Sequence, residues 1–524
     1  MRPAAVTASL PRWPRDAFPT DLATATDRLR GHLAGRIEAD GALRSPCHSR
    51  VLESSLLKAL LDRTGTEPAA GARLIDYLAA HRDSTRPLDR LLARTALGDL
   101  TTTAPLDVED FLTHAPDFTS ARKHALLDAV LLLLGAAARP ARLPGPDAFA
   151  LHGLHPWAQV QVTAVKAILA HAHGQNALIS VGEVALLRST QRPGTLWEGN
   201  LLIHLSVLHA LTPVPGQHDL VADGIRTALT YQRPDGGMPF IADEDTWVTA
   251  TAAVALHTAG APPAALDSIT QRLLHLQDPG GGWSYTEGAQ LTDVDCTSAA
   301  LEALHLAGPA THRAPIRRAL DHLTALRAPD GGFPTYLAGA PSEACMTAAA
   351  ANALSTQGPA QHTALDAALD HLASHQRPDG SFAPDWSSSR HHTLFRAVLA
   401  AAHRPGPPHS PARLITRRAT HLVLNSQNPD GGWGHQDGDP SDALSTAYAL
   451  ITLTGHPAHA PAARGTAYLL TQQRPNGSIT SIPDSIGPRP FGFHVPALAD
   501  IFTLLALGHL THRLSPVTQE QPAG

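Results

Sequence analysis

The sequence predicts an all-α protein: an α/α barrel built from repeated helical pairs, with a second helical domain before it in the chain. Three observations predict this fold. A short turn motif recurs through the C-terminal part, each copy is followed by an alanine-rich helical stretch, and no segment shows the strict alternation of a half-buried strand.

The turn motif begins with Gln or Arg, continues through a tight turn such as Pro-Asp-Gly, and ends on an aromatic or apolar residue. Proline fixes φ at the start of such a turn, and glycine supplies the positive φ that follows. The copies recur roughly every 40 to 50 residues, a period long enough for two helices per unit. They lie at residues 232–240, 277–283, 327–333, 376–382, 427–433 and 473–479, with a related turn at 191–197.

An outer helix is expected to end at each turn, and a polar loop then leads into an inner helix of small residues. Small side chains suit helices that pack closely around a common axis. The inner helices are expected at 249–256, 298–304, 346–354, 393–401 and 445–453.

The first part of the chain also reads as helices, separated by Pro and Gly breaks. Its clearest apolar periodicities lie at 51–61, 123–138 and 162–172, and 144–146 and 213–215 are loop or linker candidates. From these patterns the chain is divided into three parts. They are an N-terminal segment packing on the barrel (1–30), a helical domain (31–211) and the barrel (212–524).

Composition excludes several classes of protein. A length of 524 residues allows two or more domains, and a net charge of −6 gives no signature of nucleic-acid binding. Three cysteines without CxxC spacing indicate neither a disulfide framework nor a structural zinc site. Without a secretory leader or a run of about 18 apolar residues, the protein is expected to be cytoplasmic, with no membrane span.

One stretch, residues 291–304, carries the clearest chemistry. Asp293 and Asp295 are followed at once by Cys296 and Thr297 and then by a small-residue helix. Residues two apart do not share a helix face, so the acidic pair is expected in the turn that opens the helix, with Asp295 near the N-cap. Two buried carboxyls held close together cannot both ionise, and the resulting acid could protonate an alkene. The alternative is that Asp295 only caps the helix.

The Gln-x-x-x-Gly-x-Trp turns, combined with Asp-Val-Asp-Cys-Thr, resemble the class II terpene cyclases. The resemblance covers residues 190–510 well and the earlier part weakly. It implies a two-domain (βγ) architecture, in which 31–211 is the γ-like domain and 212–524 the β domain. Protein prenyltransferase β subunits share the turns, but they need a zinc set that adjacent Asp295 and Cys296 do not provide.

The resemblance implies roles for the acidic motif, which in the family usually reads Asp-x-Asp-Asp-Thr. Asp295 matches the general acid, and Asp293 matches the residue that holds it protonated and oriented. Cys296 departs from the pattern and is similar to the Asp-Cys-Thr of oxidosqualene cyclases, where the cysteine donates a hydrogen bond to the acid. Cys345, one repeat downstream, could be the second cysteine of such enzymes, and Thr297 completes the motif.

A cyclase pocket should be dry and lined with aromatic faces that stabilise passing cations. Trp386 begins a stretch similar to the Trp-x-x-Ser-x-Tyr-Tyr of diterpene cyclases, with His391 and His392 in place of the tyrosines, and these two are candidate terminating bases. Trp247 opens the inner helix that precedes the acidic motif, as a tryptophan does in squalene–hopene cyclases. The full set of pocket candidates is Trp247, Trp386, Trp283, Tyr285, Tyr336, Phe395 and Tyr448.

The resemblance also implies a linear isoprenoid substrate. The Asp-Asp-x-x-Asp motif of ionising terpene synthases is missing, so a diphosphate would be retained. Arg390, Arg396 and Lys166 are candidates for holding it, together with Mg²⁺, for which no ligands are assigned.

Three functions remain open at this point. The first is protonation-initiated cyclisation of farnesyl or geranylgeranyl diphosphate to a drimane- or labdane-type bicycle. The second is an epoxide-opening cyclase of an epoxidised terpenoid or meroterpenoid. The third is a non-catalytic α/α barrel that binds a lipid or a partner. An isoprenoid substrate also leaves peripheral membrane contact open.

Overall fold

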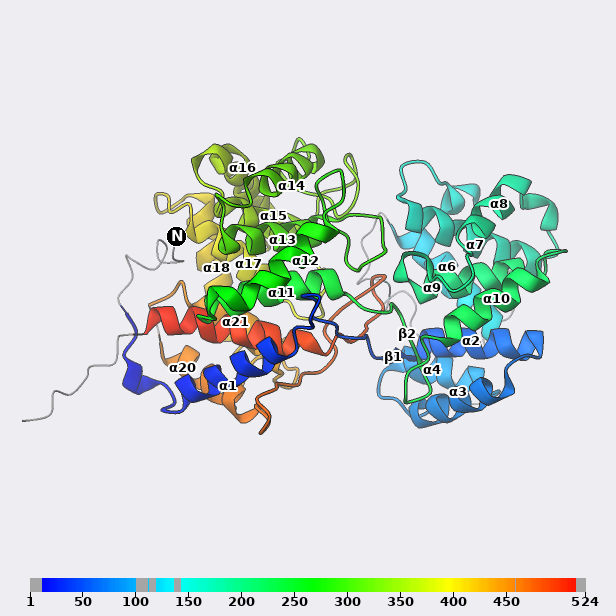
Figure 1. Cartoon of the computed structure of the whole chain (residues 1–524), viewed down its shortest axis with the longest axis horizontal. Coiled ribbons are helices and arrows are strands. Elements are labelled where there is room, and N and C mark those ends of the chain that lie inside the picture. The colour runs from blue at the N-terminus through cyan, green and yellow to red at the C-terminus, as the bar shows by residue number, and fades with distance from the viewer. Residues whose placement is uncertain (1–11, 100–111, 113–118, 136–142, 458, 515–524) are drawn as a thin grey trace, which may run out of the picture. The chain divides into compact units, whose positions relative to one another are not determined.

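The computed structural model of the chain describes residues 12–99, 112, 119–135, 143–457 and 459–514 (Figure 1). The chain divides into two compact units. We call them the barrel unit (1–45, 244–485 and 495–524) and the helical unit (46–243 and 486–494). In the described residues, sheet is confined to one antiparallel pair, β1 (Ser49–Arg50) and β2 (Met238–Pro239), so the all-α prediction is confirmed.

Six helices of the barrel unit form a closed ring in the part of the chain that is described. Each packs on the next, and the last packs back on the first. In order they are α11 (Asp245–Thr258), α13 (Val294–Ala307), α15 (Ala344–Ser355), α17 (His392–Ala402), α19 (Ala443–Leu453) and α21 (Ala497–Arg513). All are almost wholly buried, and every residue of α19 is. The first five contain the predicted inner helices, whereas α21 was not predicted as one.

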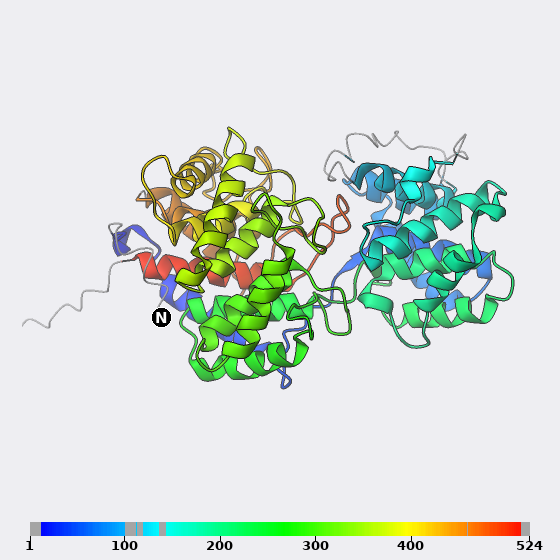
Figure 2. The same ribbon diagram turned by 90° about the horizontal axis from the view of Figure 1, so that it is seen from above.

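An outer layer of helices covers this ring (Figure 2). It consists of α12 (Asp267–Leu276), α14 (Arg313–Leu326), α16 (His362–His375), α18 (Pro411–Asn425), α20 (Ala460–Thr471) and α1 (Leu22–Gly35). Outer helices bury only one face: α14 buries Ile316, Ala319, Leu323 and Leu326, the spacing of one apolar stripe. The N-terminal helix α1 packs on α20 and α21.

The repeated turns clamp successive outer helices together. The Gln277 side chain donates to the carbonyl of Gly281 in its own turn at 2.9 Å and to that of Pro315 in α14 at 2.9 Å. Gly281 has φ +94°, and a Cβ there would lie 2.3 Å from the carbonyl oxygen of Arg318, so only glycine fits. Gln376, Gln427 and Gln473 repeat the arrangement.

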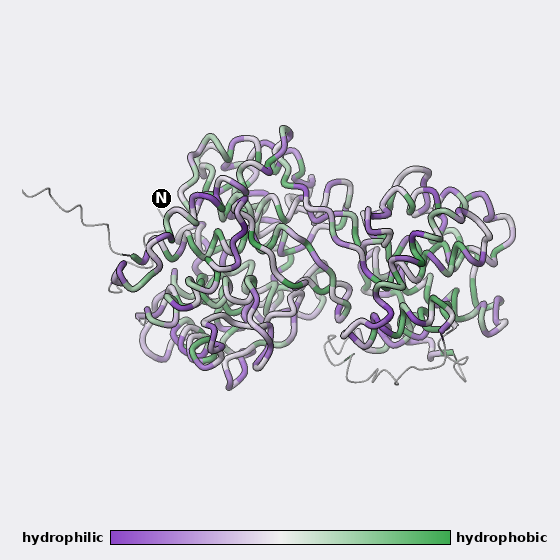
Figure 3. The backbone as a smooth tube through the Cα atoms, turned by 90° about the horizontal axis from the view of Figure 1, so that it is seen from below, coloured by the Kyte–Doolittle hydropathy of each residue, from purple (hydrophilic) through white to green (hydrophobic). Residues whose placement is uncertain are grey.

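The helical unit packs around α9 (Leu201–Leu211), all of whose residues are buried, against α2 (Val51–Thr64), α7 (Pro156–Ala172) and α10 (His218–Leu229). Its other helices are α3 (Pro68–His81), α4 (Pro87–Ala96), α6 (Ser120–Leu134) and α8 (Val181–Ser189). Figure 3 shows hydrophobic segments running through the helices of both units. Short 3₁₀ helices lie at Arg15–Ala17, Pro146–Phe149, Asn176–Leu178, Trp197–Gly199, Pro263–Leu266 and Pro359–Gln361.

The boundaries between the units differ from those expected at residues 30 and 211. Residues 212–243 belong with the helical unit, and residues 31–45 belong with the barrel unit. The reason lies in the turn at Gln232, whose side chain donates to the carbonyl of Ala70 in α3 at 3.4 Å, so this copy clamps two helices of the helical unit. Among the described residues, no helix is both long and apolar enough to span a membrane.

Candidate active site

The acidic motif opens α13, but the residue that caps the helix is not the expected one. Asp293, rather than Asp295, is the N-cap: its backbone is extended (φ −136°, ψ 164°) and its carboxylate accepts the N–H of Cys296 at 2.7 Å. Asp295 is the second residue of the helix. The helix therefore begins two residues earlier than expected, and the capping role falls on Asp293.

Asp293 is the buried carboxyl that retains its proton. Burial raises the pKa of Asp293 to about 7, and the charge of Asp295 adds to the rise, although hydrogen bonds from the thiol and the N–H of Cys296 lower it. Burial, together with the negative charge of Asp293, raises the pKa of the Cys296 thiol, which is therefore a neutral donor. The thiol was expected to donate to Asp295, and the structure instead pairs it with Asp293.

Asp295 turns toward α17 and binds Arg396. The Nη1 atom of Arg396 donates to Oδ1 of Asp295 at 2.7 Å, and the two side chains are 7% and 17% exposed. Burial alone would lower the pKa of Arg396, but Asp295, Tyr448 and Glu302 raise it above its ordinary value.

This placement is inconsistent with the expectation that Arg396 holds a diphosphate. If Asp295 is the acid that the resemblance implies, the alkene that it protonates and the diphosphate would lie at opposite ends of a linear prenyl diphosphate. Arg396, hydrogen-bonded to Asp295, would then be at the wrong end of such a substrate to hold the diphosphate.

A third carboxyl, Glu302, was not predicted from the sequence. It lies on α13 seven residues after Asp295 and accepts a 2.9 Å hydrogen bond from Nδ2 of Asn352 on α15. Burial raises the pKa of Glu302 to about 7, although Asn352 and Arg396 oppose the rise. The i, i+7 spacing from Asp295, within a helix otherwise made of apolar and small residues, was the available signal.

Aromatic rings gather beside Arg396. The ring centroids of Phe395 and Tyr448 are stacked at 5.2 Å, and both lie against Phe502 of α21, at 5.8 and 5.0 Å. Trp247 of α11 lies 6.2 Å from Phe502. Phe502 was not predicted, because α21 was not recognised as an inner helix. Three predicted pocket residues, from α11, α17 and α19, are thus brought together.

The other predicted pocket aromatics have different contacts. Tyr336 and Trp386 form an edge-to-face pair at 6.3 Å, and Tyr285 is buried, with its carbonyl accepting the N–H of Trp247 at 3.3 Å. Trp283 is fully buried in its turn, where its indole N–H donates to the carbonyl of Leu273 at 2.8 Å. Trp283 therefore ties the turn to an outer helix instead of lining the site.

Thr297 and Cys345 lie at the starts of two successive inner helices. The hydroxyl oxygen of Thr297 accepts the N–H of Trp283 at 3.1 Å, and Thr347 and Thr446 do the same for their own turns. Thr297 is thus part of the repeat rather than of the acid. Cys345 is buried in the first turn of α15.

The two candidate bases differ in their surroundings. Burial, with a smaller effect of Arg390, lowers the pKa of His391 to about 3, so its ring is neutral. Nδ1 of His392 lies 3.3 Å from Oδ2 of Asp385. Burial alone would raise the pKa of Asp385, but His392 and the hydrogen bonds of its neighbours hold it below its ordinary value.

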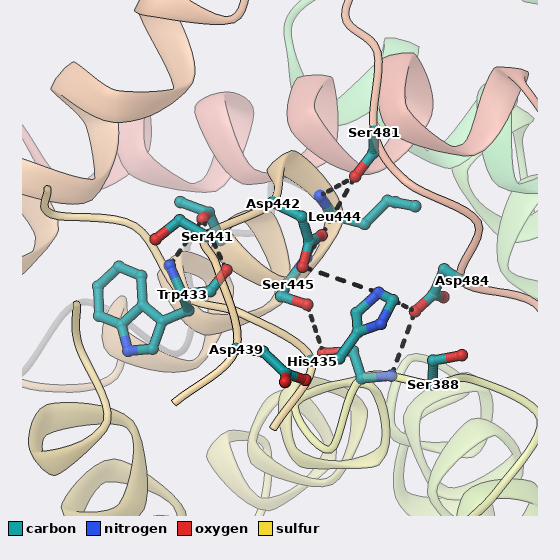
Figure 4. Close-up of polar contacts among 12 residues, drawn as sticks. Ser388, Trp433, His435, Asp439, Ser441, Asp442, Leu444, Ser445, Ser481 and Asp484 are labelled. Carbon is teal, nitrogen blue, oxygen red and sulfur yellow. Dashed lines mark hydrogen bonds and ion pairs between the residues drawn. The ribbon is translucent and has the colours of Figure 1, made fainter. Parts of the chain in front are cut away.

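A polar network fixes the segment that carries Trp386 and these histidines, and Figure 4 shows the part of it around His435, Asp442 and Asp484. Asp484 accepts the hydroxyl of Ser387 at 2.8 Å and that of Tyr448 at 3.2 Å. His435 Nε2 lies 3.5 Å from Asp484 and 3.7 Å from Asp442, which caps α19. Asp484 thus joins the Trp386 segment to the aromatic cluster, and it was not predicted from the sequence.

The remaining diphosphate candidates are engaged by carboxylates. Arg390 forms a two-pronged ion pair with Asp437, and Nζ of Lys166 lies 2.6 Å from Glu183 within the helical unit. No group of three or more His, Cys, Asp or Glu side chains suited to a metal ion occurs among the residues described.

Comparison with known proteins identifies the family. The family model described as "Squalene-hopene cyclase C-terminal domain" matches residues 337–512, and the one described as "Prenyltransferase alpha-alpha toroid domain" matches residues 246–403. The drimenyl diphosphate synthase of Streptantibioticus cattleyicolor is 39% identical over 96% of this chain and 98% of its own length. That of Streptomyces showdoensis is 39% identical over 95% and 97%.

A solved structure shares the fold over nearly the whole chain. The ent-copalyl diphosphate synthase of Streptomyces platensis superposes with a TM-score of 0.59, covering 94% of this chain and all of that one, at 20% identity. Together with the full-length sequence matches and the acidic motif at the start of α13, these similarities show that the chain belongs to the class II terpene cyclases.

Proposed function

We propose that this chain cyclises farnesyl diphosphate to a drimane-type bicycle and retains the diphosphate. The observation that carries the proposal is the assembly of Asp293, Asp295 and Arg396 at the start of one inner helix of a closed helical ring, with aromatic rings beside it. The two drimenyl diphosphate synthases that match along their whole length support the sesquiterpene chain length.

The reaction begins when Asp295, in its protonated form, transfers its proton to a carbon of the terminal double bond. A C–H bond forms, and the tertiary cation is attacked by the next alkene until two rings have closed. The faces of Phe395, Tyr448 and Trp247 would stabilise the migrating charge, each by roughly 2 kcal/mol when desolvated. Loss of a C–H proton to a base ends the reaction.

Of the two candidate bases, His392 has the better support. The carboxylate of Asp385, 3.3 Å away, would stabilise the imidazolium that forms when His392 accepts a proton. His391 has no such partner recorded for its Nδ1 atom within the described part of the chain. His392→Phe should therefore reduce turnover more than His391→Phe.

Mg²⁺ is proposed to enter as the counter-ion of the diphosphate. Mg²⁺ is commonly held by substrate phosphates with only one or two protein carboxylates, so the proposal does not require a preformed cluster. Titration with EDTA and re-addition of Mg²⁺ tests it. A cytoplasmic location is likewise part of the proposal, and fractionation of cells that express the protein tests it.

The test of function is incubation of the purified protein with farnesyl and geranylgeranyl diphosphate and Mg²⁺, followed by phosphatase treatment and GC–MS. Asp295→Asn is run in parallel, because it removes the proton but keeps the volume. A bicyclic alcohol from farnesyl diphosphate that is missing in the variant supports the proposal. Product from geranylgeranyl diphosphate alone would change the chain length, and full activity in the variant would refute the mechanism.

The alternatives have less support. An epoxide-opening acid would be expected to receive the Cys296 thiol, and that thiol is paired with Asp293. A purely structural motif explains the cap formed by Asp293 but leaves the buried pair of Asp295 and Arg396 without a purpose. Epoxidised prenyl substrates would be tried if neither diphosphate gives a product.

A further inference from the structure

The charges around the acid present a problem that the proposed function does not solve. Asp293 caps α13, and Asp295 and Glu302 lie on it. The charge of Asp295 acts on both of the other carboxyls, and the buried guanidinium of Arg396 interacts with Asp295 and Glu302. Only one carboxylate is compensated by that single cation. In the structure this is Asp295, the group that must carry a proton in order to protonate an alkene.

The geometry offers a second place for the negative charge. Asp295 and Glu302 are the second and ninth residues of α13, nearly two turns apart and therefore on one face, with a rise of roughly 10 Å between them. Arg396 reaches this face from α17, which is separated from α13 in the ring by α15. Arg396 is thus paired with Asp295, and its charge also acts on Glu302, which lies on the same face of the same helix.

The helix between them supports the second carboxyl. Asn352 is the ninth residue of α15, as Glu302 is of α13, and its amide donates to Oε2 of Glu302 at 2.9 Å. A carboxylate accepts such a bond more strongly than a protonated acid does. The site is therefore prepared to hold Glu302 in its ionised form once a cation approaches.

We propose that Glu302 is the alternate partner of Arg396, and that the guanidinium exchanges between Asp295 and Glu302 during each catalytic cycle. In the resting form Asp295 is ionised and Glu302 carries a proton. In the active form the proton has left the O–H bond of Glu302, crossed through water and formed an O–H bond on Asp295, while Arg396 pairs with ionised Glu302. Glu302 is a positioning residue, because it acts on the substrate only through Arg396 and Asp295. The proposal rests on the proposed function.

Protonation of the alkene then restores the resting form. Asp295 loses its proton to the substrate and becomes ionised again, so it recovers Arg396. Glu302, now without its cation, takes a proton from water. One proton enters the substrate, and the terminating base releases one to solvent, so the cycle balances without any further reactant.

The test is Glu302→Gln, measured as kcat, KM and the pH dependence of kcat. Glutamine keeps the volume, and its carbonyl still accepts from Asn352, but it cannot take the negative charge. We expect kcat to fall at least about tenfold, the factor produced by one pH unit of displacement in an ionisation. We also expect KM to remain unchanged and the alkaline limb of the profile to move to lower pH. Glu302→Asp should recover part of the activity.

Two further variants separate exchange from a structural role. In an Arg396→Met background there is no guanidinium to exchange, so adding Glu302→Gln should change kcat little. Asp366→Asn, which removes the carboxylate bound to Arg404 on the outer layer, is the matched control and should leave the profile in place. Wild-type kcat and pH profile in Glu302→Gln, or an equal loss in both backgrounds, would overturn the proposal.

A readout without substrate keeps this test independent of the proposed function. The free energy of unfolding is measured at pH 8 for Glu302→Gln, Arg396→Met and the double variant. The exchange requires the effect of the double variant to differ from the sum of the two single effects. Additive effects would overturn the exchange even if the enzyme is an active cyclase. A clear coupling in a protein that forms no product would refute the proposed function alone.

Discussion

Replacing Asp293 with asparagine should make the protein more stable at neutral and alkaline pH, although it removes a residue of the acidic motif. Asparagine is as good an N-cap as aspartate, and its carbonyl oxygen can still accept the N–H of Cys296. What the substitution removes is a carboxyl that is costly to ionise where it lies.

The size and sign of the effect follow from the pKa of Asp293, which burial raises from 3.8 to about 7. Below pH 3.8 both states of the protein are protonated, so Asp293 costs nothing. Between these values the unfolded chain ionises while the folded chain keeps the proton, so the stability of the wild type falls as the pH rises. A shift of about three units corresponds to a ceiling of about 4 kcal/mol, reached above pH 7.

The assay is urea unfolding of the wild type and Asp293→Asn, followed by circular dichroism between pH 4 and pH 8.5. The two curves should converge at the acid end and separate by up to about 4 kcal/mol at the alkaline end. Asp366→Asn provides a control of opposite sign, because the hydrogen bond from Arg404 lowers the pKa of Asp366. If Asp293→Asn were no more stable than the wild type at pH 8, the argument from burial would be refuted.

Three further predictions concern the surroundings of the acid. Cys296→Ser places a stronger donor on Asp293, so it should lower the pH at which Asp293 ionises and slow turnover at neutral pH; an unchanged pH–rate profile would contradict this. Trp283→Phe should cost about 1–3 kcal/mol of unfolding free energy, because a buried carbonyl loses its donor, and should leave the GC–MS product profile unchanged; a changed profile at full stability would place Trp283 in the pocket. Asp484→Asn should lower stability at pH 7 by a similar amount of about 1–3 kcal/mol, since the buried acceptor of Ser387 and Tyr448 loses its charge; no loss in thermal or urea unfolding would show that the network is dispensable.

The fold was largely predictable because its signal is local and repeated. Each turn needs its glycine and proline, and each inner helix needs small residues, so both recur in the sequence. The boundary at residue 211 failed because the turn at Gln232 has the same sequence signature as the others, and only its partner, Ala70, assigns it to the helical unit. The long C-terminal helix α21 begins at Ala497, 18 residues after its turn ends at Ile479, whereas α13, α15, α17 and α19 begin 10 or 11 residues after theirs. This longer connection kept α21 from being recognised as an inner helix.

The site was predictable only as far as the motif itself. Asp293 and Asp295 were identified, but which of them caps the helix depends on where α13 begins, and that also decides which carboxyl receives the Cys296 thiol. Arg396 was assigned to the diphosphate because composition does not show which carboxylate a distant arginine meets. Glu302 was missed, although its i, i+7 spacing from Asp295 was visible.

The last copy of the turn motif carries a consequence for how the chain is made. The Gln473 side chain donates to the carbonyl of Ala25 in α1, a residue 448 positions earlier. Arg36 directly follows α1, and its Nη1 atom lies 3.3 Å from Oδ2 of Asp500 in α21. The wall of the barrel is thus completed by joining one of the first helices synthesised to the last. Because pairings so distant in sequence form late, the apolar face of α1 must wait for nearly the whole chain to be translated. The barrel unit should therefore acquire protease resistance only when residues up to α21 are available.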